Sequence, residues 1–209
     1  MSLKRGSLAI FLALISLVCV NSATANSVNM KYLGIHNEKF LFSINGSRHF
    51  TALMCDSFDN QIHPGEDWTA TVSPFLAGIA HSMFGPSMTL DYKAAGLIYK
   101  SMLAGTLDRT HAQWAVWGLF STNADNTKQF QSLGGAAIDA AYLAMAQSAP
   151  NSAYRGLLLY TPLGAKPGSG PQEFIGYNCT TVPEPGSLTL LGTGLIVLAG
   201  AMKLKIAKI

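Results

Sequence analysis

Two side chains of this sequence could together form a reactive covalent bond, the thiol of Cys55 and the carboxamide of Gln113. A thiol that attacks a carboxamide carbon releases ammonia and leaves an acyl thioester, which a nucleophile such as an amine can open later. The reaction depends mainly on proximity, because two pre-positioned groups can gain an effective molarity of about 10⁵ M or more. The sequence places Cys55 directly after an expected strand, residues 48–54, and Gln113 near the start of an expected helix, residues 109–120.

Cys55 and Gln113 also have simpler interpretations, which the sequence leaves open. Cys55 and Cys179 are the two cysteines outside the N-terminal leader, and two cysteines in an oxidising compartment commonly form a disulfide. Cysteine is also among the most buried residue types and can pack as a small apolar side chain. A buried glutamine can serve only to satisfy backbone groups. From the residues alone, Cys55 is therefore expected in a disulfide with Cys179 or as a free thiol.

Two carboxylates, Asp56 and Asp59, follow Cys55 in an expected loop. Carboxylate oxygens suit calcium, but this loop lacks the alternating ligands and central glycine of an EF-hand. The five histidines are scattered without a pair at metal-binding spacing, and no phosphate-binding glycine loop is present. We therefore expect no metal, no cofactor and no enzyme activity. The alternative is an envelope hydrolase that uses Cys55 or the Asp56/Asp59 loop.

The hydrophobic pattern predicts strands at both ends of the central region and helices between them. Strands are expected over residues 28–35, 39–44, 48–54, 68–72, 155–161 and 173–177, and helices over residues 91–103, 109–120 and 136–147. Asn45-Gly46 is a two-residue hairpin signal, because both residues tolerate positive φ. Asp108 is a good N-cap for the second helix. The expected fold class is α+β, an antiparallel sheet or sandwich with a helical insertion.

The residues around Cys55 and Gln113 resemble the two motifs of the thioester domain of bacterial surface adhesins. That family joins a cysteine near the end of a strand to a glutamine in an apolar-Gln-x-apolar-apolar motif. Residues 112–116, AQWAV, fit the second motif at every position, whereas Met54 stands where the first motif has an aromatic residue or leucine. The resemblance implies an internal bond between Cys55 and Gln113. It also implies covalent attachment of a partner through Gln113.

The N-terminus has the pattern of a secretory signal peptide. Lys4 and Arg5 precede an apolar stretch over residues 8–20, and Ala23 and Ala25 form a small-x-small cleavage site. The expected domain organisation is a signal peptide with a signal helix over residues 1–25, an exported α+β domain over residues 26–182, and a C-terminal sorting segment over residues 183–209.

The C-terminal segment has three parts in a fixed order. Val182-Pro183-Glu184-Pro185 precedes an apolar run over residues 188–202, and three lysines follow, Lys203, Lys205 and Lys208. The run is short of the roughly 20 residues of a usual transmembrane helix, but a thin membrane could hold it. This segment resembles the PEP-CTERM sorting signal of Gram-negative bacteria. The resemblance implies processing by an exosortase, passage through the inner membrane by a C-terminal transmembrane helix, and delivery to the envelope or extracellular space.

The charge distribution argues against a nucleic-acid partner. Of the 14 basic residues, five lie in the two terminal segments, and the nine that remain face 11 acidic residues between Glu38 and Glu184. The chain without its two basic ends is therefore slightly negative. The sequence predicts an exported adhesion or interaction module that binds a surface protein or polysaccharide and carries a Cys-Gln thioester. A purely structural component of the extracellular matrix is a further alternative.

Overall fold

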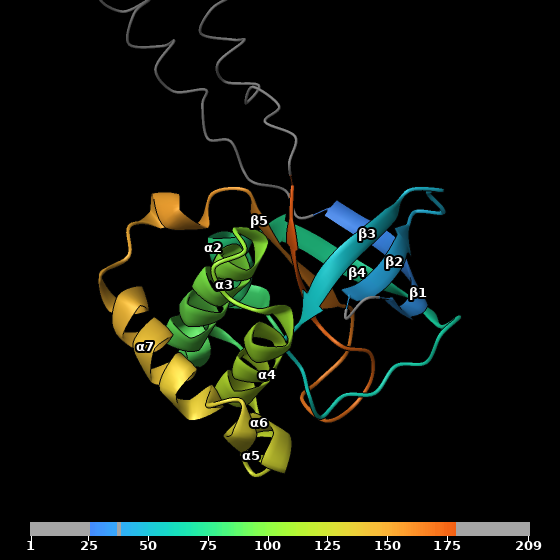
Figure 1. Cartoon of the computed structure of the whole chain (residues 1–209). Helices are drawn as coiled ribbons and strands as arrows, with labels where there is room; N and C mark the ends of the chain where they lie inside the picture. Colours follow the sequence, from blue (N-terminus) through green and yellow to red (C-terminus); the bar gives the residue numbers. More distant parts are fainter. Residues whose placement is uncertain (1–25, 37–38, 179–209) are drawn as a thin grey trace, which may run out of the picture. The chain divides into compact units, whose positions relative to one another are not determined.

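The computed structural model of this protein describes residues 26–36 and 39–178 (Figure 1). All of them belong to one compact unit, Ala23–Cys179. The expected signal helix, the expected C-terminal transmembrane helix and Cys179 lie outside the described residues. Within the described ranges, no helix is both long and apolar enough to cross a membrane.

Six strands form a closed antiparallel barrel with the order β1-β2-β3-β6-β5-β4. The strands are β1 (Asn26–His36), β2 (Lys39–Ile44), β3 (Phe50–Cys55), β4 (Asp67–Pro74), β5 (Leu157–Pro162) and β6 (Phe174–Tyr177). The prediction of an antiparallel sheet or sandwich is therefore wrong, because the sheet closes into a barrel. The barrel closes because β1 pairs with both β2 and β4, while the two last strands fill the gap between β3 and β4.

The barrel interior is filled by aromatic and other large apolar side chains. Phe42 and Phe174 lie in contact with their ring centroids 4.6 Å apart, and Phe40 contacts Phe174 at 5.7 Å. Alternate residues of each strand point inward, as the two-residue period of a strand requires. The buried members of this cluster are Met30, Tyr32, Phe40, Phe42, Leu53, Cys55, Ala70, Tyr160 and Phe174. Cys55 is therefore an inward-facing residue of the barrel.

Asn45-Gly46 forms the predicted tight turn after β2, but β3 begins only at Phe50 and Ser43 pairs with Phe50, so the prediction of a two-residue hairpin is wrong and residues 44–49 connect the paired strands. Asn45 and Gly46 both have positive φ, 51° and 69°, and the Ser47 N–H donates to the Ile44 carbonyl at 3.0 Å. The β2–β3 register is therefore offset by two residues from the one that this turn alone would set. Phe40 of β2 pairs with Leu53 of β3.

The helices form one insertion between β4 and β5 and pack against one side of the barrel (Figure 1). The α-helices are α2 (Phe75–Gly78), α3 (Thr89–Leu103), α4 (Arg109–Phe120), α5 (Thr122–Asp125), α6 (Lys128–Ser132) and α7 (Gly135–Ser148), and the short 3₁₀ helices are η1 (Ile79–His81), η2 (Pro86–Met88) and η3 (Asn151–Tyr154). A second apolar core lies between them and the barrel. Met54 and Ile175 are its contributions from β3 and β6, so β3 faces both cores on alternate residues.

Helix α4 begins where the sequence predicts. The Asp108 carboxylate accepts hydrogen bonds from the Thr110 N–H at 2.9 Å and the His111 N–H at 3.2 Å. This cap satisfies two of the N–H groups that the first turn of a helix leaves without partners. Residues Ala112, Ala115, Val116 and Leu119 are buried along one face. The cap and the buried face together fix α4 against the end of β3.

Candidate functional site

The side chain of Gln113 lies against the main chain of Cys55. The Gln113 Oε1 accepts a hydrogen bond from the Cys55 N–H at 3.3 Å, and the Gln113 Nε2 donates to the Cys55 carbonyl at 2.6 Å. Both groups are buried. The structure therefore brings together the two predicted residues, which are 58 positions apart in the chain.

The need for this contact follows from the strand pattern. On one edge, β3 pairs with β6 through Cys55 and Phe174, and the next residue, Asp56, donates its N–H to the Glu173 carbonyl at 3.3 Å. Successive residues of a strand direct their N–H and C=O groups to opposite edges. The N–H and C=O groups of Cys55 therefore point to the edge of β3 that faces β2. At this position β2 offers no partner, because Phe40–Leu53 is the last residue pair between the two strands. There the Gln113 amide acts as one more strand partner.

The thiol of Cys55 is free and fully buried. Its Sγ donates to the Ser57 carbonyl at 3.7 Å. Burial raises the pKa of the Cys55 thiol to about 12, and the neighbouring Asp56 carboxyl adds to this, whereas hydrogen bonds from Trp117 and Ser57 act in the opposite direction. At neutral pH the thiol is therefore protonated. Its reactivity depends on what lies beside it, since a buried thiol is otherwise inert.

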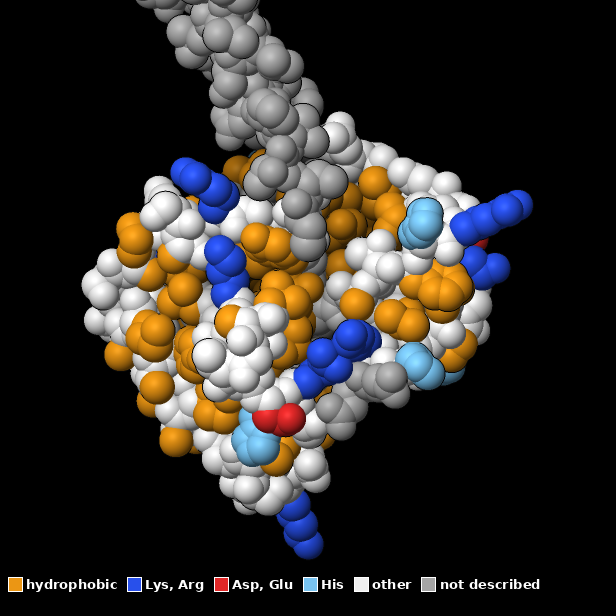
Figure 2. All heavy atoms as spheres, turned by 45° about the horizontal axis from the view of Figure 1, so that its top comes forward, with side chains coloured by type: hydrophobic (Ala, Val, Ile, Leu, Met, Phe, Trp, Pro, Cys, Tyr) orange, Lys and Arg blue, Asp and Glu red, His pale blue; other side chains and the backbone are white. Residues whose placement is uncertain are grey.

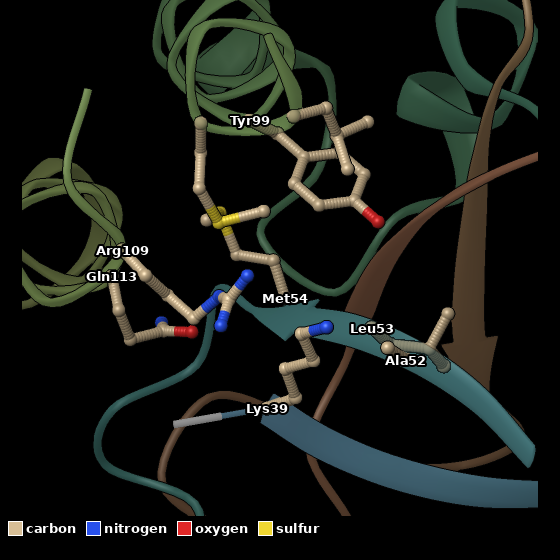
Figure 3. A pocket seen from close by; sticks show the side chains of 9 residues that line it. Lys39, Ala52, Leu53, Met54, Tyr99, Arg109 and Gln113 are labelled. Carbon is tan, nitrogen blue, oxygen red and sulfur yellow. The ribbon is translucent and has the colours of Figure 1, made fainter. Parts of the chain in front are cut away.

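A small cavity of about 110 Å³ opens onto the carboxamide of Gln113 (Figure 3). Met54 and Tyr99 contribute to its wall, and Figure 3 shows the Arg109 guanidinium beside the Gln113 amide with the Lys39 amine pointing toward the same space. Its lining comes from β2, β3, α3 and the first two turns of α4. A small nucleophile could therefore approach Gln113 from this cavity while Cys55 stays within the barrel.

A pair of buried carboxyl groups adjoins Cys55. Asp56 and Glu173 have no exposed surface. Glu173 accepts hydrogen bonds from the hydroxyls of Tyr92 and Thr161 and from the Met83 N–H at 3.0 Å. No donor contacts the oxygens of Asp56. The three donors favour the charged form of Glu173, whereas the oxygens of Asp56 have no donor, so Asp56 is the carboxyl of the two that keeps its proton more readily. Burial and the nearby Glu173 charge raise the pKa of Asp56 well above its usual range.

The Asp56/Asp59 loop is held by structural contacts. Asp59 accepts from the Ser121 hydroxyl at 2.7 Å and the Asn123 amide at 2.8 Å, so it fixes the loop to the end of α4 and to α5. Asn60 donates to the carbonyls of Lys166 and Gly170, both at 3.0 Å, and thus fixes the loop to the β5–β6 connection. Across residues 26–36 and 39–178, no group of His, Cys, Asp and Glu is arranged to hold a metal.

His111 does not contact Cys55. Its ring Nδ1 lies 3.0 Å from the Asp108 carboxylate, at the exposed start of α4. Sequence reasoning missed two residues near this strand end, Trp117 beside the cluster that contains Cys55 and Glu173 beside Asp56. Trp117 could have been found, because positions four apart share one face of a helix and Gln113 is four residues earlier. Glu173 carries no sequence signal, since only the pairing of β3 with β6 brings it to Asp56.

Replacing Asp56 by Asn should stabilise the protein at alkaline pH. A carboxyl whose folded-state pKa is raised keeps its full contribution below the unfolded pKa and loses it as pH rises through the folded pKa. The stability of the wild type should therefore fall as pH rises from the unfolded pKa of an aspartate, about 4, toward the raised folded-state pKa of Asp56. Asp56→Asn should flatten this fall and gain on the order of 1–3 kcal/mol at pH 9. Urea unfolding at several pH values measures the free energy of unfolding of each protein. Asp67→Asn, at an exposed position, is the control. If the stability of the wild type, Asp56→Asn and Asp67→Asn changed equally with pH, the raised pKa of Asp56 would be contradicted.

Removing the Gln113 amide should destabilise the protein even where no thioester can form. In a Cys55→Ala background, Gln113→Ala leaves a buried N–H and a buried carbonyl without their partner, at a cost of about 1–3 kcal/mol. Gln131→Ala, at an exposed position of α6, should change stability by less than about 0.5 kcal/mol. Thermal and urea unfolding of the two double variants compare them. Equal stabilities of the two double variants would show that the hydrogen bonds between Gln113 and β3 do not contribute to the stability of the fold.

Comparison with known proteins identifies the C-terminal segment. Residues 181–203 match the family model described as the PEP-CTERM protein-sorting motif. No curated protein and no solved structure matches the chain. The matched residues contain the predicted Val182-Pro183-Glu184-Pro185 motif, the whole apolar run over residues 188–202 and Lys203, so the prediction of a sorting signal is confirmed. Signals of this class are processed by exosortase during export through the membrane. The chain therefore carries a PEP-CTERM sorting motif, which supports its sorting to the cell envelope.

Proposed function

We propose that the barrel and its helices form an attachment module with an internal thioester between Cys55 and Gln113. The observation that supports this most directly is the buried pair of hydrogen bonds between the Gln113 amide and the Cys55 main chain. They hold the carboxamide carbon beside the residue whose Sγ would attack it. The module would act without turnover, as a binding protein and not as an enzyme.

The proposed reaction has two steps. In the first, the Cys55 Sγ forms a bond to the Gln113 Cδ, the bond from Cδ to Nε2 breaks, and the thiol proton leaves with the nitrogen as ammonia. In the second, a nucleophile on a partner bonds to the same carbon, the bond to sulfur breaks, and Cys55 becomes a thiol again. Each step relies on pre-positioned groups, which the contact of α4 with the end of β3 supplies.

The surroundings of the pair suit a stored thioester. Cys55 is fully buried, and Gln113 is only 9% exposed. Water therefore has little access to the acyl carbon, which protects a thioester from hydrolysis. The cavity lined by Lys39, Met54 and Gln113 offers the route for a partner's amine or hydroxyl. The partner would be a protein or polysaccharide of the cell surface, and its attachment would be covalent through Gln113.

One observation favours a purely structural role instead. The Gln113 amide contacts the main chain of Cys55, so it also completes the hydrogen bonding of β3 as a strand partner would. A module of this kind would bind or space other envelope components without covalent chemistry. A hydrolase is less well supported, because the Cys55 thiol is buried and Asp59 is engaged by Ser121 and Asn123.

Intact mass separates the two roles. We expect the processed wild type to be about 17 Da lighter than its calculated mass, because forming the thioester releases ammonia. Methylamine should then add about 31 Da at Gln113, found by peptide mapping, and should free one thiol. A disulfide between Cys55 and Cys179 would remove only about 2 Da.

Three variants serve as controls for this measurement. Cys55→Ala and Gln113→Ala should each lose the mass deficit and the uptake of methylamine, whereas Cys179→Ala should keep both. A wild type at its full calculated mass that takes up no methylamine would leave the structural role as the better account.

The sorting signal should decide where the module is found. Deletion of residues 183–209 removes the PEP-CTERM motif, so the chain should be exported but lost from the envelope fraction. Cell fractionation with immunodetection compares it with the full chain. Replacing Lys203, Lys205 and Lys208 by Gln gives a milder variant that keeps the motif and the apolar run. An unchanged distribution of the deleted chain would show that something else retains the protein.

A further inference from the structure

We propose that the cavity in front of Gln113 selects an acidic polysaccharide, with a sugar hydroxyl directed at Gln113 and a carboxylate of the same sugar bound by Lys39 and Arg109. This inference rests on the proposed thioester and names the class of partner that would open it. It starts from the charge of the cavity, which the bond between Cys55 and Gln113 does not use.

Lys39 reaches the cavity because of the register of β2 against β3. Phe40 pairs with Leu53, and both belong to the cluster inside the barrel. Because side chains alternate along a strand, Lys39 is directed to the outer face, on the side of Met54. The helices cover this face, since Met54 packs in the core between them and the barrel. Figure 3 shows the Lys39 amine directed toward the cavity.

Arg109 reaches the same cavity from the helix. It is the first residue of α4, one turn before Gln113, so the two side chains leave the helix on one face. Figure 3 shows its guanidinium beside the Gln113 amide. A guanidinium has several N–H donors in one plane, so a contact made elsewhere still leaves donors for a carboxylate. Lys39 and Arg109 therefore place positive charge beside the reacting group.

Lys39 and Arg109 are the only charged side chains among the described residues that line the cavity. Most of the other lining side chains are apolar, Met54, Met102 and Leu103 among them. Apolar walls lower the local dielectric, so a charge in the cavity interacts more strongly with the two cations than it would in water. Even in water, two unit charges about 4 Å apart interact by about 1 kcal/mol. A carboxylate is therefore favoured in this cavity, and an ammonium is disfavoured.

These charges favour a polysaccharide over a protein as the partner. The usual amine of a protein surface is the lysine ammonium, which Lys39 and Arg109 repel and which must lose a proton before it can attack. A sugar hydroxyl is neutral. A sugar acid also carries its carboxylate and its hydroxyls on one rigid ring, which suits a cavity of only about 110 Å³. In an acidic peptide the two groups lie on separate flexible side chains, whose ordering costs entropy.

The reaction with a sugar hydroxyl needs no further reagent. The hydroxyl oxygen forms a bond to the Gln113 Cδ, the bond from Cδ to the Cys55 sulfur breaks, and the hydroxyl proton ends on that sulfur. The product is an ester between Gln113 and the sugar, and Cys55 is a thiol again. Because the bound carboxylate holds the hydroxyl near Cδ, this step also gains from proximity.

The first test measures binding where no thioester can form. In Cys55→Ala, oligogalacturonate should bind about tenfold more tightly than its methyl ester, which is neutral and otherwise alike. Lys39→Gln or Arg109→Gln in this background should remove most of that difference, whereas Lys39→Arg should keep it. Lys128→Gln, which removes an exposed charge of α6 outside the cavity, should also keep it. Isothermal titration calorimetry measures each Kd, and the preference should weaken as salt is added.

The second test measures the reaction in the processed protein. Wild type incubated with oligogalacturonate should carry the sugar as an ester on Gln113, found by intact mass and peptide mapping. In Lys39→Gln, the rate with oligogalacturonate relative to the rate with methylamine should fall about tenfold, because only the first nucleophile carries a carboxylate. Lys128→Gln should keep the ratio of the wild type.

Two results would overturn the inference. One is equal binding of oligogalacturonate and its methyl ester by Cys55→Ala. The other is binding of poly-glutamate as tight as that of oligogalacturonate, which would point to an acidic protein instead. A wild type that takes up no methylamine would refute the thioester, whereas the binding measured with Cys55→Ala would still decide which partner the cavity selects.

Discussion

The contact between the Gln113 amide and the Cys55 main chain is the constraint on which the rest of the site depends. It joins the helical insertion to the barrel at the end of β3. There the N–H and C=O of Cys55 extend past Phe40–Leu53, the last residue pair between β2 and β3. Because the amide satisfies both groups, α4 cannot shift along β3 without leaving two buried groups unpaired. Three other features support this contact. They are the Asp108 cap of α4, the buried face of α4, and the hydrogen bonds by which Asn60 fixes the loop after β3.

Cys55 and Asp56 are neighbours in the chain and are both buried, but they lie in different surroundings. Cys55 faces the barrel interior, whereas Asp56 pairs with Glu173 at the opposite edge and keeps its proton more readily than Glu173 does. The thiol therefore lies in a dry site that holds it protonated and keeps water away. A thioester in such a site would persist through export and react only when a partner enters the cavity in front of Gln113. Figure 2 shows one face of the module, on which apolar side chains are interspersed with polar and backbone atoms and Lys and Arg side chains are more prominent than acidic ones.

The sequence was informative where local rules decide the structure. The Asn45-Gly46 turn, the Asp108 cap and the bounds of α4 follow from residue types at fixed spacing, and the structure has them. Closure of the barrel could not be predicted in this way, because β6 is placed between β3 and β5 by pairing across long stretches of chain. The motifs singled out Cys55 and Gln113, yet nothing in them shows that Gln113 bonds the main chain. Trp117 was within reach of helical periodicity, whereas Glu173 becomes a neighbour of Asp56 only through the barrel.

The C-terminal signal concerns where the protein is sorted, whereas the module concerns what the protein does there. The PEP-CTERM motif determines that the protein is sorted to the envelope, and the same motif can accompany many activities. What the protein does there depends on the bond between Cys55 and Gln113. A high-resolution crystal structure of the exported protein, prepared without reducing agents or amines, tests this most directly. The account predicts continuous electron density between Cys55 Sγ and Gln113 Cδ, with no density for Nε2. A complete Gln113 amide hydrogen-bonded to the Cys55 main chain, with a free thiol beside it, would contradict it.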